Sequence, residues 1–382
     1  MDLLNKPITL TFPHRVYFTR NAFAPQNETL LEVLSGKVRV YVDEGVVAGR
    51  PDLLTEVIHW MRAHRDRVSL VDDGVSATAG GEACKNDWSL VEYYWWDMNR
   101  VGLDRHSTVL AIGGGAFLDL VGFAAATAHR GVRLVRMPTT TLSQGDGGVG
   151  VKNGVNYFKK KNWVGTFAVP WAVVNDFALL DGLPPREMRS GLIEGIKVAL
   201  LRDAALFEAI EARAEALAAL EPEAVEFVVR RSAELHLEHI ATGGDPFELG
   251  SARPLDFGHW VAHKIEPSSR YRILHGEAVA IGMAVDLVYA RRIGLLAPAD
   301  CARILRLISR IGFALYDKEL NRRDKQGALR VLLGLEEFRE HLGGELTITL
   351  VTGIGRRVEV HAMDTEIVRE AMEELKTWTA TP

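Results

Sequence analysis

The amino-acid sequence predicts an α/β domain with a mostly parallel, wound sheet, followed by a mainly α-helical domain. Short β-rich runs alternate with helical patterns over the first half of the chain, as in sheets whose strands are joined by crossover helices. One run ends in three glycines and opens into a helix at 109–131. After Pro184 the chain is rich in Ala, Leu and Glu at helical spacing. Because 382 residues are many for one core, we expect two domains, 1–180 and 181–382.

The first domain is expected to contain five strands with helices between them. Helical patterns cover residues 51–66 and 89–102. The β-rich runs, each ending in turn residues, are 10–19, 38–47, 67–74, 107–115 and 133–141.

The second domain is expected to be helical, with one short strand at 345–352. The cleft between two such domains is a favoured place for a ligand. The helical patterns cover residues 191–220, 223–241, 276–293, 298–312 and 364–378.

Composition excludes several classes of function. A formal charge of −5 provides no field for nucleic acid, and the lysine run 159–161 is too short to bind a polyanion. No apolar stretch reaches the roughly 18 residues of a membrane span, and the first residues do not resemble a signal peptide. Cys84 and Cys301 cannot form a disulfide framework, so we expect a cytoplasmic protein without nucleic-acid or membrane partners.

The glycine-rich turn at 113–115 indicates a nucleotide site. Glycines let the backbone approach a diphosphate, and the start of the following helix favours its negative charge. The pattern is not a full GxGxxG, because Ala116 follows Gly115. A tight strand-to-helix turn would use the same glycines, so both interpretations stay open.

Two other tracts favour the nucleotide interpretation. AGGEACK, residues 79–85, is a second Gly-Gly turn and carries Glu82 and Lys85. Asp43 follows an early strand, where a carboxylate can bind ribose hydroxyls or simply form a turn. Residues 137–154 combine hydroxyls and glycines with charged side chains, and we interpret them as an irregular binding loop.

A carboxylate and two imidazoles in the second half form a candidate metal site. Glu194, His259 and His275 are a ligand set that holds Zn²⁺ and leaves one position open for substrate. His263 follows His259 by four residues on the same helix face. A single histidine is more often structural, but His259 and His275 both stand at an expected helix start.

A set of cationic and amide side chains is a candidate phosphate cradle, in which Lys acts as a point charge and Arg as a bidentate donor. The alternative for each is a solvated surface position. The set comprises Lys152, Lys161, Asn162, Lys197 and Arg130.

Together these tracts resemble the sugar phosphate cyclase superfamily, whose best-known member is 3-dehydroquinate synthase. They occur in the order of the family from about residue 40 to about residue 290, roughly two-thirds of the chain. The matching tracts are AGGEACK, the stretch 112–154, KKNWVG, GLIEGIK, LDFGHWVAH and HGEAVAIGM.

The resemblance implies an NAD-binding α/β domain, a helical metal-binding domain and a homodimer. It implies zinc as the metal, with cobalt or iron open because ligand type only narrows the choice. Arg130 would reach the phosphate of the neighbouring subunit. The implied metal ligands are Glu194, His259 and His275; the implied NAD-binding residues are Asp43, Glu82, Lys85, Gly114, Gly115, Asp119, Thr139 and Thr140; the implied substrate residues are Asp146, Lys152, Lys161, Asn162, Lys197, Asp256 and His263.

The implied reaction turns a heptulose 7-phosphate into a carbocycle. It comprises transient oxidation by NAD⁺, elimination of phosphate, return of the hydride and an intramolecular aldol closure. Because NAD is recycled, the enzyme would be a lyase.

Several departures bear on the substrate. Asp256 stands where 3-dehydroquinate synthases usually carry asparagine, and Ala252 stands where they carry a carboxylate-binding arginine, with Arg253 next to it. His236 aligns with an expected lysine, and Leu335-Glu336-Glu337 replaces a DKK stretch. An added carboxylate and lost cations disfavour a carboxylate-bearing substrate.

We therefore expect a cyclase that uses a sedoheptulose 7-phosphate type of substrate, although His263 keeps a histidine that many valiolone-type enzymes replace. A divergent 3-dehydroquinate synthase acting on 3-deoxy-arabino-heptulosonate 7-phosphate is the main alternative. A metal-dependent polyol or glycerol dehydrogenase and a non-catalytic binding protein are the others.

Overall fold

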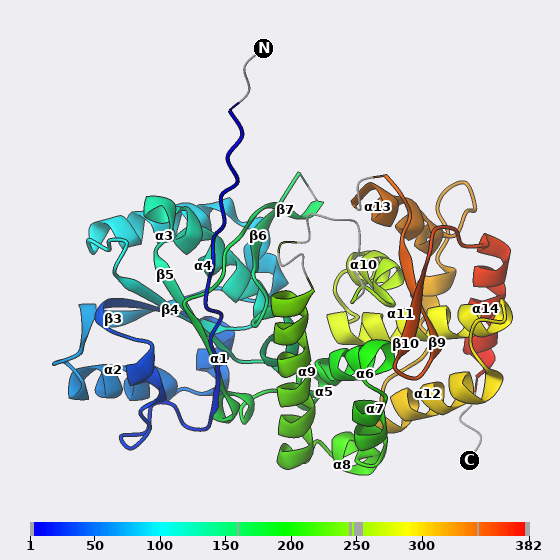
Figure 1. The fold of residues 1–382 in the computed structure, drawn as a ribbon, viewed down its shortest axis with the longest axis horizontal. Coiled ribbons are helices and arrows are strands. Elements are labelled where there is room, and N and C mark those ends of the chain that lie inside the picture. The colour runs from blue at the N-terminus through cyan, green and yellow to red at the C-terminus, as the bar shows by residue number, and fades with distance from the viewer. Residues whose placement is uncertain (1–3, 159, 244–246, 248–254, 342–343, 379–382) are drawn as a thin grey trace. The chain divides into compact units, whose positions relative to one another are not determined.

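The computed structural model describes residues 4–158, 160–243, 247, 255–341 and 344–378 (Figure 1). The chain divides into two compact units, one of residues 1–139 and 150–182 and one of residues 140–149 and 183–382. The predicted domains, 1–180 and 181–382, differ from these units mainly at residues 140–149. This segment packs against helix α9, Pro222–Thr242, of the second unit.

The first unit is built on a six-stranded parallel sheet with the order β1-β8-β5-β4-β2-β3, as far as the described residues show. This confirms the predicted α/β class with a parallel, wound sheet. The strands are β1 Val16–Thr19, β2 Gly36–Asp43, β3 Val68–Thr78, β4 Thr108–Gly113, β5 Arg133–Pro138 and β8 Ala172–Asp176.

Apolar residues cover both faces of this sheet because alternate side chains of a strand point to opposite faces. Val40 belongs to one apolar cluster with Trp60 of α2, Leu53–Ala63. The next residue, Tyr41, belongs to the other cluster, to which α3, Trp88–Arg100, and α4, Gly115–Thr127, contribute. The sheet therefore lies between two apolar layers.

An antiparallel hairpin of β6, Lys152–Tyr157, and β7, Lys160–Phe167, lies outside the parallel sheet and packs on α4. The sequence predicts an irregular loop at 137–154, so the beginning of this hairpin corrects that expectation. Gly154 and Gly165 face each other, and a Cβ on Gly165 would stand 2.5 Å from the Asn153 carbonyl oxygen. The glycines thus serve close strand approach.

The second unit is mainly helical, as predicted, with a two-stranded sheet of β9, Ile348–Gly353, and β10, Arg356–Val360. None of the described helices is long and apolar enough to cross a membrane. Besides α9, the helices are α5 Pro185–Ser190, α6 Leu192–Arg202, α7 Ala204–Glu211, α8 Ala214–Ala218, α10 His259–Ser268, α11 His275–Arg292, α12 Pro298–Ile311, α13 Leu333–His341 and α14 Thr365–Thr377.

The helical pattern at 191–220 forms three helices rather than one. Asp203 ends α6 and caps α7, because its carboxylate accepts a hydrogen bond from the Leu206 amide at 2.9 Å. Ala and Leu favour helix on either side of this residue, but a side chain that satisfies the free amides of a new helix start outweighs that preference.

Glycines let helix α11 pack closely on its neighbours. A Cβ on Gly276 would stand 1.9 Å from the Ser190 carbonyl oxygen, and one on Gly282 would stand 2.0 Å from the Gly258 carbonyl oxygen. Gly258 itself has a φ of +78°, a left-handed conformation that favours glycine. These contacts fix the start of α10 and the start of α11 against the rest of the second unit.

Asp286 of α11 holds the start of α10 through two hydrogen bonds. Its carboxylate accepts the Trp260 indole N–H at 2.8 Å and the Gly258 amide at 3.0 Å. Burial raises the pKa of Asp286 to about 7, although both hydrogen bonds act to lower it.

Replacement of Asp286 with Asn is expected to change how stability depends on pH. The folded chain keeps the Asp286 proton up to about pH 7, whereas the unfolded chain loses it near the ordinary value of 3.8. The free energy of unfolding of the natural protein should therefore fall relative to Asp286→Asn between these values, by up to roughly 1.4 kcal/mol per pH unit, and run parallel above them. Urea unfolding from pH 4 to pH 8.5 tests this, with the exposed Asp66→Asn as control, and parallel curves throughout would contradict it.

Candidate active site

The second unit brings Glu194, His259 and His275 together. One ligand atom from each residue lies within 4.8 Å of the others. The three residues come from α6, α10 and α11, so tertiary packing creates the cluster. Glu194 is 1% exposed and His259 is 7% exposed. The predicted metal ligands thus converge at one place.

Hydrogen bonds orient both imidazoles. His259 Nδ1 lies 3.0 Å from the Phe257 carbonyl oxygen, and His275 Nδ1 lies 3.2 Å from Glu266 Oε2. Each partner accepts a hydrogen bond from the Nδ1–H, so the other ring nitrogen keeps its lone pair, the usual arrangement around a metal-binding histidine. Burial, together with the charge of Lys197 and two neighbouring histidines, holds the pKa of His259 well below its usual value.

The cluster fits a divalent cation. Glu194 Oε1 is buried and accepts no hydrogen bond from the described residues, and it lies 3.9 Å from His275 Nε2. A buried carboxylate oxygen without a donor is costly unless a cation balances it. One carboxylate with two neutral imidazoles matches a zinc site with an open position.

Lys197 forms a buried ion pair with Glu194 one helical turn away. Burial acts to lower the pKa of Lys197, but the carboxylates of Glu194, Asp146 and Asp256 outweigh it and raise the pKa. The ammonium group is therefore charged, and three carboxylates act on it.

The other candidate substrate residues of the second unit lie around this cluster. The ring centroid of His263 lies 5.4 Å from that of His259 and 6.3 Å from that of His275. Asp146 Oδ1 lies 3.1 Å from His236 Nδ1. The Asp256 carbonyl accepts the His259 amide, while Ala252 and Arg253 lie outside the described residues.

In the first unit, Asp43 lies against the glycine-rich turns. Its carboxylate accepts the Gly45 amide at 2.8 Å, and the Gly114 amide also bonds to it. Burial raises the pKa of Asp43 above its usual value, against these hydrogen bonds. A Cβ on Gly80 would stand 2.1 Å from the carboxylate, so only glycine fits at this position. Helix α4 begins at Gly115, and no side chain caps this helix start. The backbone amides of its first turn are suited to a phosphate group.

Lys85 connects the candidate NAD residues with the hairpin. Its ammonium lies 2.7 Å from Asp119 Oδ2 and donates to the Asn162 side chain. Lys161 Nζ lies 3.5 Å from Glu82 Oε1. Residues predicted for NAD and residues predicted for substrate are therefore bonded to each other in this unit.

The remaining candidates are spread over both units. Thr139 belongs to the first unit, where its amide donates to the Gly113 carbonyl, whereas Thr140 belongs to the second. Lys152 is exposed at the start of β6, and Arg130 is exposed with a φ of +63°.

Three structurally important polar residues are not found by the sequence analysis. Glu266 and Asp286 support the metal cluster, as described above. Arg136 is fully buried and donates to the carbonyl oxygens of Gly150 at 2.8 Å and Lys152 at 3.0 Å, which fixes the backbone at Lys152. The available signal is a charged residue inside an apolar strand or helix pattern, as at 133–138 and 278–290.

Comparison with known families confirms the resemblance. Residues 75–190 match the family described as 3-dehydroquinate synthase N-terminal, and residues 191–330 match 3-dehydroquinate synthase C-terminal. The chain therefore belongs to the 3-dehydroquinate synthase-like family of sugar phosphate cyclases.

Relatives of similar sequence carry different enzyme names. The chain is 39% identical over 278 residues to 2-epi-5-epi-valiolone synthase of Streptomyces glaucescens, covering 72% of this chain and 70% of that protein. It is 35% identical to 2-epi-valiolone synthase of Actinosynnema mirum, with coverage of 91% and 88%. It is also 34% identical to 3-dehydroquinate synthase of Cereibacter sphaeroides, with coverage of 84% and 87%.

A solved structure supports the same fold. The enzyme ValA, a 2-epi-5-epi-valiolone synthase of Streptomyces hygroscopicus subsp. jinggangensis with NAD⁺ and Zn²⁺ bound, superposes with a TM-score of 0.86 at 27% identity. The match covers 98% of this chain and 99% of ValA.

Loss of a ligand and loss of its support should affect metal binding to different degrees. Glu194→Ala is expected to abolish stoichiometric zinc binding, because it removes the only carboxylate of the ligand set. Glu266→Gln should weaken zinc affinity by roughly 10- to 100-fold, because it weakens the hydrogen bond that orients His275. Chelator competition and metal analysis measure both effects, circular dichroism checks the fold, and full zinc content in Glu194→Ala would refute the ligand assignment.

Proposed function

We propose that this chain is an NAD- and zinc-dependent sugar phosphate cyclase that converts a sedoheptulose 7-phosphate type of substrate to a carbocycle with loss of phosphate. The observation that carries the proposal is the largely buried cluster of Glu194, His259 and His275 with the charged Lys197 beside it. Relatives named valiolone synthases, and ValA with NAD⁺ and Zn²⁺, support the cofactors and the substrate class.

The two cofactors would supply hydride transfer and polarisation of the carbinol and carbonyl oxygens. Their proposed binding residues belong to separate units, with Asp43 and the α4 start for the nucleotide and Glu194 and the two histidines for the metal. The proposed reaction needs both cofactors and therefore both units.

The residues of the chain would bind and orient the substrate. Lys197 keeps its proton and can hold a hydroxyl or alkoxide oxygen near the metal ligands. Lys152, Lys161 and Asn162 would hold the phosphate, and Lys85 orients the amide of Asn162 by donating to its oxygen. We also propose a cytoplasmic homodimer in which Arg130 of one copy completes the phosphate site of the other.

The carboxylates near Lys197 favour a sugar phosphate that carries no carboxylate of its own. Asp146 and Asp256 both act on Lys197, which also faces Glu194, so this part of the second unit already holds three carboxylates. His236 is paired with Asp146 where the family expects a lysine. A further carboxylate on the substrate would be repelled unless a new cation balanced it.

A divergent 3-dehydroquinate synthase is the second candidate. The relative of that name in Cereibacter sphaeroides covers more of this chain than the Streptomyces glaucescens relative does. His263 is also kept beside the two metal-ligand candidates.

Phosphate release should distinguish the candidates. We expect the zinc-loaded protein with NAD⁺ to release phosphate from sedoheptulose 7-phosphate and not from 3-deoxy-arabino-heptulosonate 7-phosphate, with no net formation of NADH. Release from the second substrate alone would establish the 3-dehydroquinate synthase activity. Net NADH from a polyol would indicate a dehydrogenase instead.

Two lysines of the same hairpin provide a matched test of the phosphate cradle. Lys152→Ala is expected to lower kcat/KM for phosphate release by roughly 10- to 100-fold, the effect of losing one charge-assisted contact of 1.5–3 kcal/mol. Lys160→Ala should leave it within about twofold, because Lys160 lies over the Trp163 ring, 4.9 Å from its centroid. Equal effects of the two substitutions would refute the assignment of Lys152.

A further inference from the structure

The segment before β1 is an extended arm without a partner among the described residues. Residues 4–13 are all exposed, and they form no strand pair. The arm nevertheless carries Leu4, Ile8, Leu10 and Phe12, which are 93%, 86%, 73% and 54% exposed. Figure 1 shows this arm extending away from the rest of the first unit. Apolar residues at this density mark a contact surface.

The central part of the arm has the pattern of a β-strand. Ile8, Leu10 and Phe12 alternate with threonines, and β-branched and aromatic residues favour strands. Pro7 and Pro13 enclose this stretch, and neither has an N–H to donate to a sheet. Residues 8–12 therefore form a five-residue unit suited to pairing, a common strand length.

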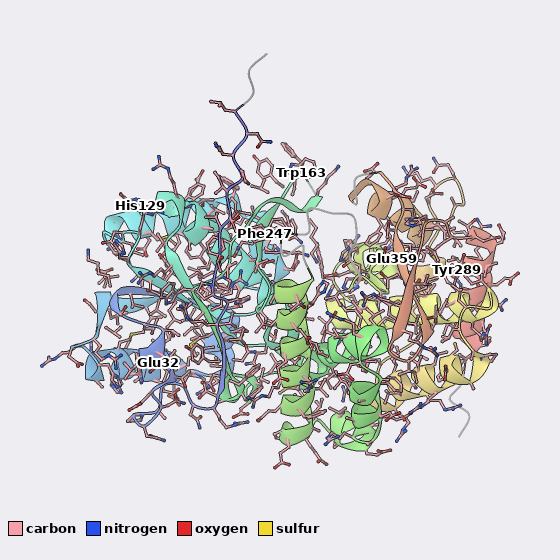
Figure 2. The ribbon with its side chains drawn as sticks, viewed as in Figure 1. Glu32, His129, Trp163, Phe247, Tyr289 and Glu359 are labelled. Carbon is pink, nitrogen blue, oxygen red and sulfur yellow. The ribbon has the colours of Figure 1, made fainter. Side chains whose placement is uncertain are left out.

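Strand β7 offers a matching surface. Among the described strands only β6 pairs with it, and its exposed face carries Trp163, Gly165 and Phe167. Trp163 is 55% exposed and Phe167 is 39% exposed (Figure 2 labels Trp163 at the hairpin). The opposite face turns Val164 towards the apolar cluster under α4.

More aromatic side chains lie where β6 ends. Phe158 is 72% exposed and its ring contacts those of Tyr157 and Trp163, while Tyr157 also contacts Trp88 of α3. Exposed aromatic residues are enriched at interfaces between proteins. Trp163, Gly165 and Phe167 are spaced by two residues, and so are the apolar residues of the arm. Leu10, at the centre of the arm, can therefore fill the space over Gly165.

We propose that residues 8–12 of one copy of this chain add as an antiparallel strand to β7 in a second copy, along the edge that faces away from β6. Leu10 would lie beside Gly165, with Ile8 and Phe12 beside Phe167 and Trp163. Antiparallel pairing keeps Lys6 away from Lys160 and Lys161, whereas parallel pairing in this register places them together. Addition of a strand to an exposed edge is a common mode of recognition.

The occupant is a second copy because the described residues of the arm do not pair with β7 of their own copy. Val173 donates its amide to the Arg15 carbonyl where β1 and β8 begin to pair, but Pro13 and Pro170 precede this point. Both lack the N–H that would continue the pairing upstream. The proposal does not depend on the proposed catalytic activity.

Cross-linking of two differently tagged chains tests the proposal. One chain carries Thr9→Cys and the other Thr166→Cys, two positions that face each other in the proposed register. Both natural cysteines are buried. After co-expression, a short bis-maleimide should join the two chains, and the unsubstituted chain gives the background. Adding Ile8→Asp and Leu10→Asp to the Thr9→Cys chain should reduce the product at least tenfold. Leu10→Asp alone should also reduce the product, whereas Leu4→Asp, the same single change outside residues 8–12, should leave it unchanged.

Other results would overturn the proposal. A cross-link that survives Ile8→Asp and Leu10→Asp would show contact without strand docking. A product within a single chain carrying both cysteines, without one between chains, would place the arm on its own hairpin. Absence of both products would show that the arm does not lie on β7.

Discussion

The Glu194 carboxylate, buried in the second unit, is the constraint on which the site depends. Such a group is stable only where cations and donors surround it closely, because its removal from water costs several kcal/mol. Lys197 supplies one cation, and the two imidazoles leave lone pairs for a metal. Three helices must therefore meet within a few ångströms, and the packing of the unit has to hold them there.

The glycines of the motifs meet this requirement because they have no side chain, which lets the helices pack closely. Gly276 lets the start of α11 lie on Ser190, and Gly282 lets its middle lie on Gly258. The His275 and His259 rings are carried by the same two helix starts. A sequence motif that combines histidine with glycine thus contains both a ligand and the close contact that positions it.

Much of the fold follows from the sequence, and the exceptions have physical causes. Val40 and Tyr41 are neighbours in the chain and belong to different apolar layers. This two-residue periodicity is the sequence signal of a buried strand. The break at Asp203 and the hairpin at β6 and β7 depend on one cap and on paired glycines, which are weak local signals. The close approach of Gly154 and Gly165 exists only once both strands are formed.

The residues of the candidate site also fall into those that the sequence predicts and those that it does not. Residue type and helix position predict the cluster of Glu194, His259 and His275, because few other side chains bind a metal. Glu266, Asp286 and Arg136 act through other residues, and their role needs the partner in space. Their sequence signal is a charge in an apolar pattern: Asp286 is the one charged residue in the stretch of α11 from Ala278 to Ala290, which is buried throughout. Since an isolated buried charge is costly, such a residue implies a partner even before the partner can be identified.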